Sequence, residues 1–180
     1  MKITKIHDQI WEVTDFLSED RLNILLNIAN NSDDQLWYQP DAPEYWQGKV
    51  LMISEFFEID DYFVENLDTD LTNLFINSTN VLPVSTIIRY RVGEGKGVHR
   101  DNDGEKDLLN VYGLVFYLND DYQGGELYYP GLDFEIKPKK NSVLIHYAGI
   151  EHGVRDVKSG IRYVITSFIQ GTQETKVREN

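Results

Sequence analysis

The spacing of hydrophobic residues divides the chain near Pro83. Before this point, apolar residues recur every three or four positions in two stretches, which is typical of amphipathic helices. The first stretch follows Ser18, a residue type that caps helices, and ends near residues 30–33; the second spans residues 61–77. The same part of the chain predicts two strands and a loop, at residues 9–13, 50–57 and 33–48 respectively.

After Pro83, short apolar segments alternate with turn-forming residues such as Asn102-Asp103-Gly104. Many short strands at this spacing are typical of sandwiches and jelly rolls. We therefore expect a mainly β fold with supporting helices, in which residues 84–170 form a double-stranded β-helix (jelly roll). The two α-helices of residues 1–83 should pack on one sheet, and residues 1–180 should form a single domain. The expected strands cover residues 84–92, 97–101, 109–118, 125–129, 133–136, 142–147, 151–155 and 160–169.

Composition limits the location and the partners of the protein. The net charge is −13, and residues 1–80 contribute −12 of it, which disfavours a surface for nucleic-acid phosphates. The absence of cysteine excludes disulfides and thiolate metal sites. No apolar run approaches the roughly 18 residues of a membrane span, and the N-terminus becomes charged too early for a signal peptide. We expect a cytoplasmic protein without membrane or nucleic-acid partners.

Two histidines and one aspartate form a candidate metal site. His99 and Asp101 are two residues apart, so on a strand both side chains point to one face and can reach one ion. His146 and His152 compete to be the third ligand. His152 is favoured because it lies near a turn, where its ring can reach the metal, whereas His146 lies in an apolar segment and suits the core. Such a set can hold a divalent iron and leave positions open for a co-substrate and O₂.

Arg162, which begins the last predicted strand, is a candidate ligand for an anion. Period-2 alternation places it on one strand face with Val164 and Thr166, and a cation among apolar neighbours is costly unless it is paired. Its guanidinium could bind a carboxylate through two parallel hydrogen bonds, or it could form a structural salt bridge. Tyr90 and Tyr117, on two other strands, could offer hydroxyls to the same carboxylate or be ordinary core residues.

Together these segments resemble the catalytic core of the 2-oxoglutarate- and Fe(II)-dependent dioxygenases, specifically the prolyl-4-hydroxylase-like branch. The resemblance covers residues 84–169, and the helical portion before them resembles the supporting helices of that family only loosely. The matching segments are Ile88-Arg89-Tyr90, His99-Arg100-Asp101, Tyr117-Leu118-Asn119, Gly124-Gly125-Glu126-Leu127, His152-Gly153-Val154 and Gly160-Ile161-Arg162-Tyr163.

The resemblance implies an enzyme that hydroxylates a substrate C–H bond with O₂ while 2-oxoglutarate is converted to succinate and CO₂. Ascorbate would be an accessory reductant. A carboxylate at position 101 favours hydroxylation, because related halogenases have a small residue there. By resemblance, the iron ligands are His99, Asp101 and His152, and the residues at 2-oxoglutarate are Arg162, Thr166, Tyr117 and Tyr90.

Two positions depart from the family pattern. Many relatives have lysine where this chain has Arg162, which leaves the binding of a carboxylate intact. Many have threonine where this chain has Leu127, so a hydroxyl contact to the co-substrate is not expected at that position.

The motifs leave the substrate open. Resemblance favours a prolyl or other residue in a peptide, and a free amino acid is the close alternative because the chain is short. The loop at residues 36–48, which contains Trp37 and Trp46, could cover the open side of the roll or pack as a hydrophobic flap on the sheet. Two alternatives from other classes are a jelly-roll module that binds metal without turnover and a nucleic-acid demethylase.

Overall fold

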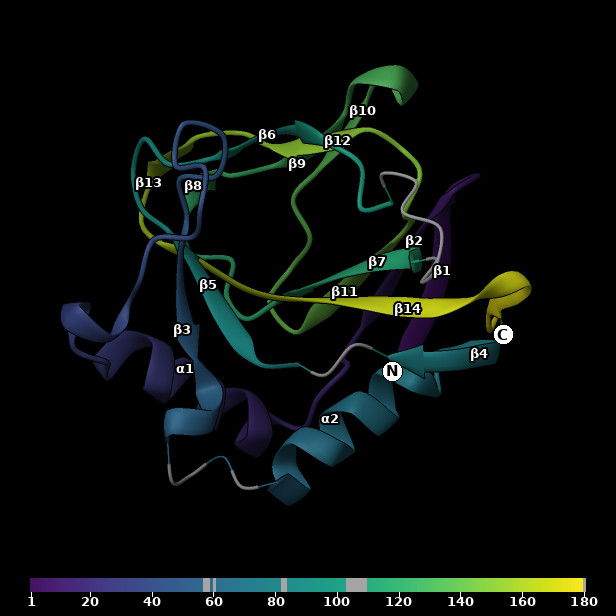
Figure 1. The fold of residues 1–180 in the computed structure, drawn as a ribbon, viewed down its shortest axis with the longest axis horizontal. Helices are drawn as coiled ribbons and strands as arrows, with labels where there is room; N and C mark the ends of the chain where they lie inside the picture. The colour runs from purple at the N-terminus through teal and green to yellow at the C-terminus, as the bar shows by residue number, and fades with distance from the viewer. Residues whose placement is uncertain (57–58, 60, 82–83, 103–109, 180) are drawn as a thin grey trace.

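The computed structural model describes residues 1–180 except 57–58, 60, 82–83, 103–109 and 180. The described residues form two facing β-sheets, and helices α1 (Glu19–Asn31) and α2 (Asp61–Thr72) cover the outer face of the larger sheet. In Figure 1 the helices lie below the large sheet, and β6, β9 and β12 lie above it. The expected jelly roll with two supporting helices on one sheet is therefore confirmed.

The large sheet brings the N-terminal and C-terminal parts of the chain together. Its strand order among the described residues is β1-β2-β11-β7-β14-β5-β3, and β4 pairs with β14 outside this path. The strands are β1 (Lys2–His7), β2 (Ile10–Thr14), β3 (Lys49–Met52), β4 (Phe75–Val81), β5 (Thr86–Tyr90), β7 (Asn110–Tyr117), β11 (Ser142–Tyr147) and β14 (Arg162–Val177).

The small sheet faces the large one and carries both histidines of the candidate metal set. Its order is β10-β9-β12-β6, and a separate pair joins β13 to β8. His152 on β12 pairs directly with His99 on β6. These strands are β6 (Lys96–His99), β8 (Gln123–Gly124), β9 (Leu127–Tyr129), β10 (Phe134–Ile136), β12 (His152–Val154) and β13 (Val157–Ser159).

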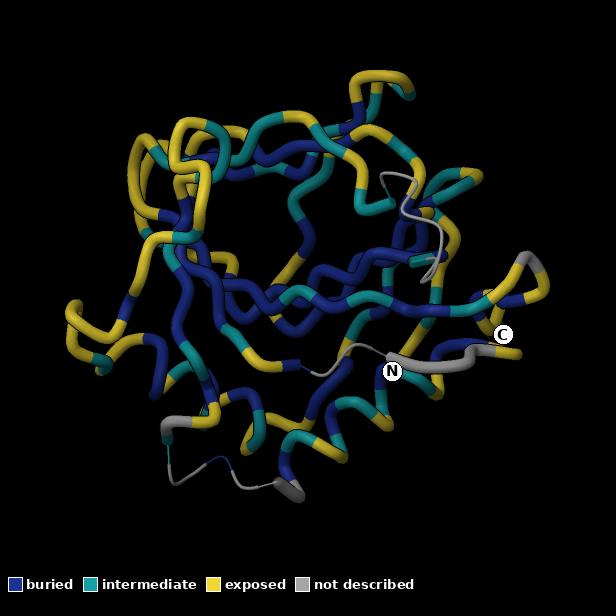
Figure 2. The backbone as a smooth tube through the Cα atoms, viewed as in Figure 1, coloured by how far each residue is buried: buried dark blue, intermediate teal, exposed yellow. Residues whose placement is uncertain are grey.

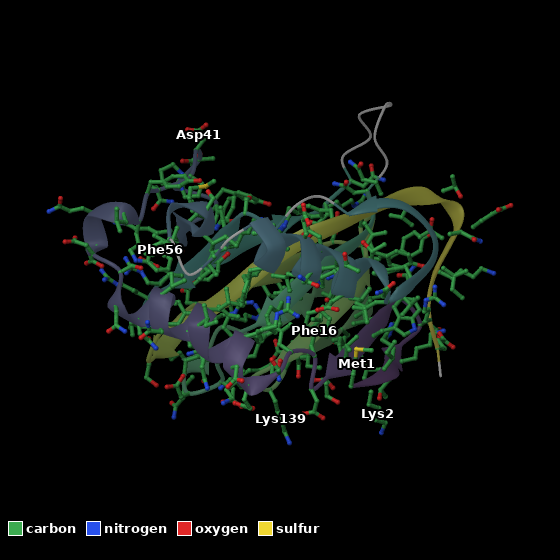
Figure 3. The ribbon with its side chains drawn as sticks, turned by 90° about the horizontal axis from the view of Figure 1, so that it is seen from below. Met1, Lys2, Phe16, Asp41, Phe56 and Lys139 are labelled. Atoms are coloured by element: carbon green, nitrogen blue, oxygen red, sulfur yellow. The ribbon has the colours of Figure 1, made fainter. Side chains whose placement is uncertain are left out.

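The helices are held by a continuous apolar cluster on the outer face of the large sheet. Helix α1 begins after Ser18, whose side chain accepts a hydrogen bond from the Arg21 amide as an N-cap. Leu22 and Leu25 of α1 and Leu67 of α2 are fully buried in this cluster. Figure 2 shows buried backbone along the central strands, and Figure 3 shows the helices crossing the sheet while Lys2 and Lys139 project outward.

Alternation along the strands gives the large sheet two different faces. On β7, Phe116 packs with the helices, while Val115 and Tyr117 belong to a second cluster between the two sheets. On β14, Tyr163 and Ile165 likewise face the helices. The opposite residues of β14 line the cavity between the sheets, as period-2 alternation predicted: Arg162, Val164, Thr166 and Phe168.

Several predicted boundaries were wrong because distant pairing overrides the local pattern. The helix predicted over residues 61–77 ends at Thr72, and Phe75 instead starts β4 and pairs with Val177. The strand predicted over residues 50–57 is β3, which ends at Met52 and continues as a 3₁₀ turn. Strands β1 and β13 were not predicted, and β14 extends eight residues beyond the predicted end at residue 169.

Three predictions fall partly outside the described residues: Phe57 at the end of one strand, Asp103 and Gly104 of one turn, and Leu109 at the start of another strand. Among the described residues, no helix has the length and hydropathy needed to cross a bilayer.

Candidate metal and co-substrate site

The structure brings His99, Asp101 and His152 together in the cavity between the sheets. One potential ligand atom from each residue lies within 4.8 Å of the other two. His99 ends β6, His152 begins β12, and Asp101 follows β6 with its amide bonded to the Ala148 carbonyl at 2.9 Å. Two imidazole nitrogens and one carboxylate oxygen form the donor set that suits a divalent iron with open positions.

Backbone carbonyls fix the orientation of both histidine rings in the same way. Nδ1 of His99 lies 3.0 Å from the Gly97 carbonyl, and Nδ1 of His152 lies 3.0 Å from the Ile150 carbonyl. A carbonyl can only accept, so each Nδ1 carries the hydrogen and each neutral ring presents the Nε2 lone pair. Both Nε2 atoms point toward Asp101, at 3.4 Å from Oδ1 and 3.6 Å from Oδ2. These tautomers are the ones that can ligate a metal through Nε2.

His146 contacts the same carboxylate but plays a different part. Its Nε2 lies 2.9 Å from Oδ2 of Asp101, and its Nδ1 lies 3.2 Å from the Tyr129 hydroxyl. A carboxylate accepts, so the neutral ring donates through Nε2–H and Nδ1 accepts from Tyr129. With both nitrogens engaged, His146 orients Asp101 and has no free lone pair for a metal. His152 keeps a free lone pair on Nε2 and stays the predicted third ligand.

Gly113 on β7 leaves the space in which this hydrogen bond forms. A Cβ at that position would overlap Oδ2 of Asp101 and would lie 2.5 Å from Nε2 of His146. A glycine inside an apolar strand often marks such a close approach. The sequence analysis missed the contact between His146 and Asp101. Gly113 was the one feature of the sequence that could have indicated it.

The local electrostatics hold the candidate ligands in their metal-binding protonation states. Burial, followed by the neighbouring His146, lowers the pKa of His152 to about 3, so its ring is neutral at pH 7. Burial alone would raise the pKa of Asp101, but its interactions with His146 and His99 outweigh this effect and place its pKa below the ordinary value. The site therefore offers a neutral His152 imidazole and an ionised Asp101 carboxylate.

Arg162 lies in the same cavity and is almost fully buried, at 1% exposure. Its Nη2 donates to the Tyr117 hydroxyl at 3.2 Å, and its Nε is buried without a hydrogen-bond partner among the described residues. No described carboxylate forms an ion pair with it. A buried guanidinium with an unused donor fits the carboxylate of a bound ligand.

Two of the predicted residues around Arg162 lie beside it, and the third, Thr166, lines the same cavity further along β14. The guanidinium carbon lies 5.0 Å from the ring centroids of both Tyr90 and Tyr117. Tyr90 and Thr166 line the cavity, whereas Tyr117 supports Arg162 through its hydroxyl and is not among the lining residues. Tyr122, which sequence reasoning missed, is buried with a hydroxyl that lacks a partner of good geometry among the described residues.

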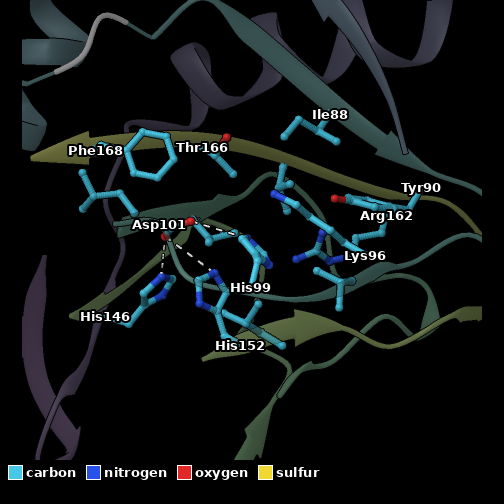
Figure 4. Close-up of a pocket in the computed structure, with 15 residues that line it drawn as sticks. Ile88, Tyr90, Lys96, His99, Asp101, His146, His152, Arg162, Thr166 and Phe168 are labelled. Carbon is cyan, nitrogen blue, oxygen red and sulfur yellow. Dashed lines mark hydrogen bonds and ion pairs between the residues drawn. The ribbon is translucent and has the colours of Figure 1, made fainter. Parts of the chain in front are cut away.

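Lys96 is a further cation in this cavity that sequence reasoning missed. It lies three residues before His99 on β6 and lines the cavity with Asp101 and Arg162. Its ammonium is 4.4 Å from the ring centroid of Trp46. Figure 4 shows Lys96 beside Arg162 and His99, with dashed lines joining Asp101 to the three histidines.

The two tryptophans of the loop at residues 36–48 lie on different sides of the large sheet. Trp37 is 3% exposed and belongs to the helix-side cluster, where it contacts Tyr163 and the Arg89 guanidinium. Trp46 packs against the cluster between the sheets. The flap interpretation therefore describes Trp37, whereas Trp46 lies on the cavity side of the sheet and its contact with a substrate stays a prediction.

Three solved prolyl hydroxylases have folds similar to that of this chain. A prolyl-4-hydroxylase from Pseudomonas putida is 16% identical, with a TM-score of 0.70 over 91% of this chain and 93% of that chain. A viral collagen prolyl hydroxylase from Paramecium bursaria Chlorella virus-1, solved as a 2-oxoglutarate complex, is 18% identical, with a TM-score of 0.67 over 92% and 97%.

The chain has the prolyl hydroxylase fold. A third structure, a prolyl hydroxylase from Trichoplax adhaerens with a peptide fragment of the hypoxia-inducible factor, is 16% identical, with a TM-score of 0.62 over 91% of this chain and 84% of that chain. No family model and no curated protein sequence matches the chain. The fold expected from six short motifs is thus shared with solved hydroxylases across almost the whole chain.

Proposed function

We propose that the protein is an Fe(II)- and 2-oxoglutarate-dependent dioxygenase that hydroxylates an amino-acid unit. The first candidate is a prolyl or other residue of a peptide. The observation that carries this proposal is the pairing of two features in one cavity. One is the His99–Asp101–His152 set, and the other is Arg162, a buried cation without a carboxylate partner among the described residues.

The two features match the two ends of 2-oxoglutarate. When bound, iron would activate O₂, the oxidant, while 2-oxoglutarate is decarboxylated, which is the chemistry needed to hydroxylate an unactivated C–H bond. Arg162 binds the distal carboxylate, and Tyr117 orients the guanidinium through its hydroxyl. His146 orients Asp101. Apolar side chains of Ile88 and Val164 exclude water from the cavity between these charged groups.

The substrate class rests on fold likeness and on the surroundings of the cavity. The Trichoplax enzyme was solved with a peptide fragment, which supports a peptide substrate here by analogy. Trp46 and Tyr45 lie beside Lys96 and His99 at the edge of the cavity, where an apolar substrate surface could stack. A cytoplasmic location is part of this proposal, because the chain has no cysteine.

The test is 2-oxoglutarate-dependent succinate formation by the purified protein with Fe(II), O₂ and ascorbate. We expect succinate from the wild type, strong inhibition by an iron chelator, and a gain of one oxygen in a hydroxylated peptide or amino acid by mass spectrometry. Asp101→Asn should abolish succinate formation and metal binding, because it removes the only carboxylate of the ligand set. Asp156→Asn, an exposed aspartate, is the matched control.

Failure of the wild type to consume 2-oxoglutarate while it binds iron at these three residues would favour the metal-binding module without turnover. Normal succinate formation by Asp101→Asn would show that the site lies elsewhere.

A further inference from the structure

Lys96 is a cation that the proposed machinery leaves unused. It reaches into the cavity that contains Asp101 and Arg162, and most of its side chain is buried. Its ammonium stacks on Trp46 at 4.4 Å from the ring centroid. Burial lowers the pKa of Lys96; the Asp101 charge opposes this effect, and the Arg162 charge adds to it. Among the described residues, no carboxylate forms an ion pair with it.

With iron and 2-oxoglutarate bound, the charges of the site would leave Lys96 without a counter-ion. A divalent iron with the Asp101 carboxylate has one net positive charge, and Arg162 adds a second. The two carboxylates of 2-oxoglutarate balance these two charges. Lys96 then remains as a partly buried positive charge, which is costly unless an anion pairs with it. Nothing in the iron or co-substrate chemistry requires this additional cation.

Resting on the proposed function, we infer that Lys96 binds a carboxylate of the primary substrate. Because Lys96 and His99 lie on one strand, a carboxylate at Lys96 would hold the rest of the substrate beside the metal ligands. Trp46 would cover the apolar part of the same substrate. Substrates of this chemistry are a free amino acid, a C-terminal residue of a peptide, or an acidic residue within a peptide.

Trp46 holds Lys96 in position through the backbone as well as the ring. The two residues form an isolated antiparallel bridge, which ties the loop containing Trp46 to β6. Lys96 also pairs with Val154 of β12, next to His152. The ammonium is therefore carried by backbone that is fixed on two sides, as a specificity residue requires.

The test compares acids with their neutral amides. Each free L-amino acid is compared with its amide, and each short peptide with a free C-terminus is compared with its C-terminal amide. Each peptide with an internal Asp or Glu is compared with the same peptide carrying Asn or Gln. Binding is measured by titration calorimetry on Mn(II)-loaded protein with N-oxalylglycine in place of 2-oxoglutarate. We expect at least one acid to bind about tenfold or more tightly than its amide, as a charge-assisted pair predicts.

Variants then assign that preference to Lys96. Lys96→Gln should remove the acid preference and leave the affinity for 2-oxoglutarate within about twofold, while Lys96→Arg should retain part of the preference. Lys158→Gln, an exposed lysine on β13, is the matched control and should behave as the wild type. The substrate group that shows the acid preference then identifies the source of the carboxylate: a free amino acid, a peptide C-terminus or an acidic side chain.

Two results would overturn the role of Lys96 and leave the proposed function intact. One is equal binding of every acid and its amide by the wild type. The other is a Lys96→Gln variant that loses affinity for 2-oxoglutarate but keeps the acid preference, which would make Lys96 a ligand of the co-substrate. If metal-loaded wild type does not bind 2-oxoglutarate at all, the proposed function fails as well, so the two failures are distinguishable.

Discussion

The two faces of the large sheet bury different kinds of side chain. The face toward α1 and α2 packs an extensive apolar cluster that includes Leu22, Leu67 and Phe116. The face toward the small sheet has a smaller cluster and, beside it, buried His146, His152 and Arg162. Apolar burial stabilises the fold, whereas buried polar and charged groups cost free energy unless they are paired.

This difference separates stability from chemistry within single strands. On β14, Tyr163 and Ile165 face the helices, and Arg162 and Thr166 face the cavity. Each strand therefore anchors the fold with one set of residues and presents a ligand-binding group with the other. Variants on the helix side should change the free energy of unfolding, and variants on the cavity side should change ligand binding.

The two tryptophans of the loop at residues 36–48 give the largest expected effect. Trp37→Ala should lower the free energy of unfolding by about 3–5 kcal/mol, because it leaves a large void in the helix-side cluster. Trp46→Ala, the matched variant in the cavity-side cluster, should destabilise less and impair hydroxylation while sparing slow, uncoupled succinate formation. Urea denaturation and the ratio of hydroxylated product to succinate measure the two effects. Equal destabilisation without a change in that ratio would contradict the distinction.

Arg162→Met should weaken 2-oxoglutarate binding by about 2–5 kcal/mol, the magnitude for one lost partner of a buried charge pair. Because the guanidinium has no carboxylate partner among the described residues, replacement by an apolar chain should not lower the free energy of unfolding. Calorimetric titration and urea denaturation provide the readouts. Arg155→Met, at an exposed arginine paired with Glu135, is the control. Unchanged 2-oxoglutarate affinity would disprove the role of Arg162.

His146→Phe should have the smallest effect of the three, a decrease in metal affinity of roughly 10–100-fold. Phenylalanine keeps a ring in the buried position but removes the hydrogen bond that orients Asp101. Competition with a metal-sensitive dye measures the affinity, and the absorption spectrum of the Co(II)-substituted protein reports whether the ligand geometry has changed. A loss of affinity well beyond this range, together with a Co(II) spectrum that shows a changed coordination number, would make His146 a ligand instead of a positioning residue.

The sequence predicted the residues that line the cavity better than it predicted the ends of the elements and the contacts between distant segments. The spacing of His99 and Asp101 and the alternation after Arg162 depend on local strand geometry, which a short motif specifies. The role of Phe75 depends on pairing with Val177, about a hundred residues away, and no local pattern reports it. The contact between His146 and Asp101 likewise joins distant segments.

Lys96 shows why some functional residues escape sequence reasoning. Its neighbours His99 and Gly97 point to a motif, but a lysine near a turn is ordinarily assigned to the surface. Its burial follows from Trp46, which reaches it from a loop fifty residues upstream. Only the three-dimensional arrangement shows that the cavity contains a second cation.

The most direct test of the account is the position of iron in a crystal prepared without oxygen, with Fe(II) and 2-oxoglutarate. If these three residues bind the metal, we expect one anomalous-scattering peak at about 2.0–2.2 Å from Nε2 of His99, a carboxylate oxygen of Asp101 and Nε2 of His152. We also expect the distal carboxylate of 2-oxoglutarate to contact Arg162. An iron peak bound by other residues, or 2-oxoglutarate bound away from Arg162, would contradict the account.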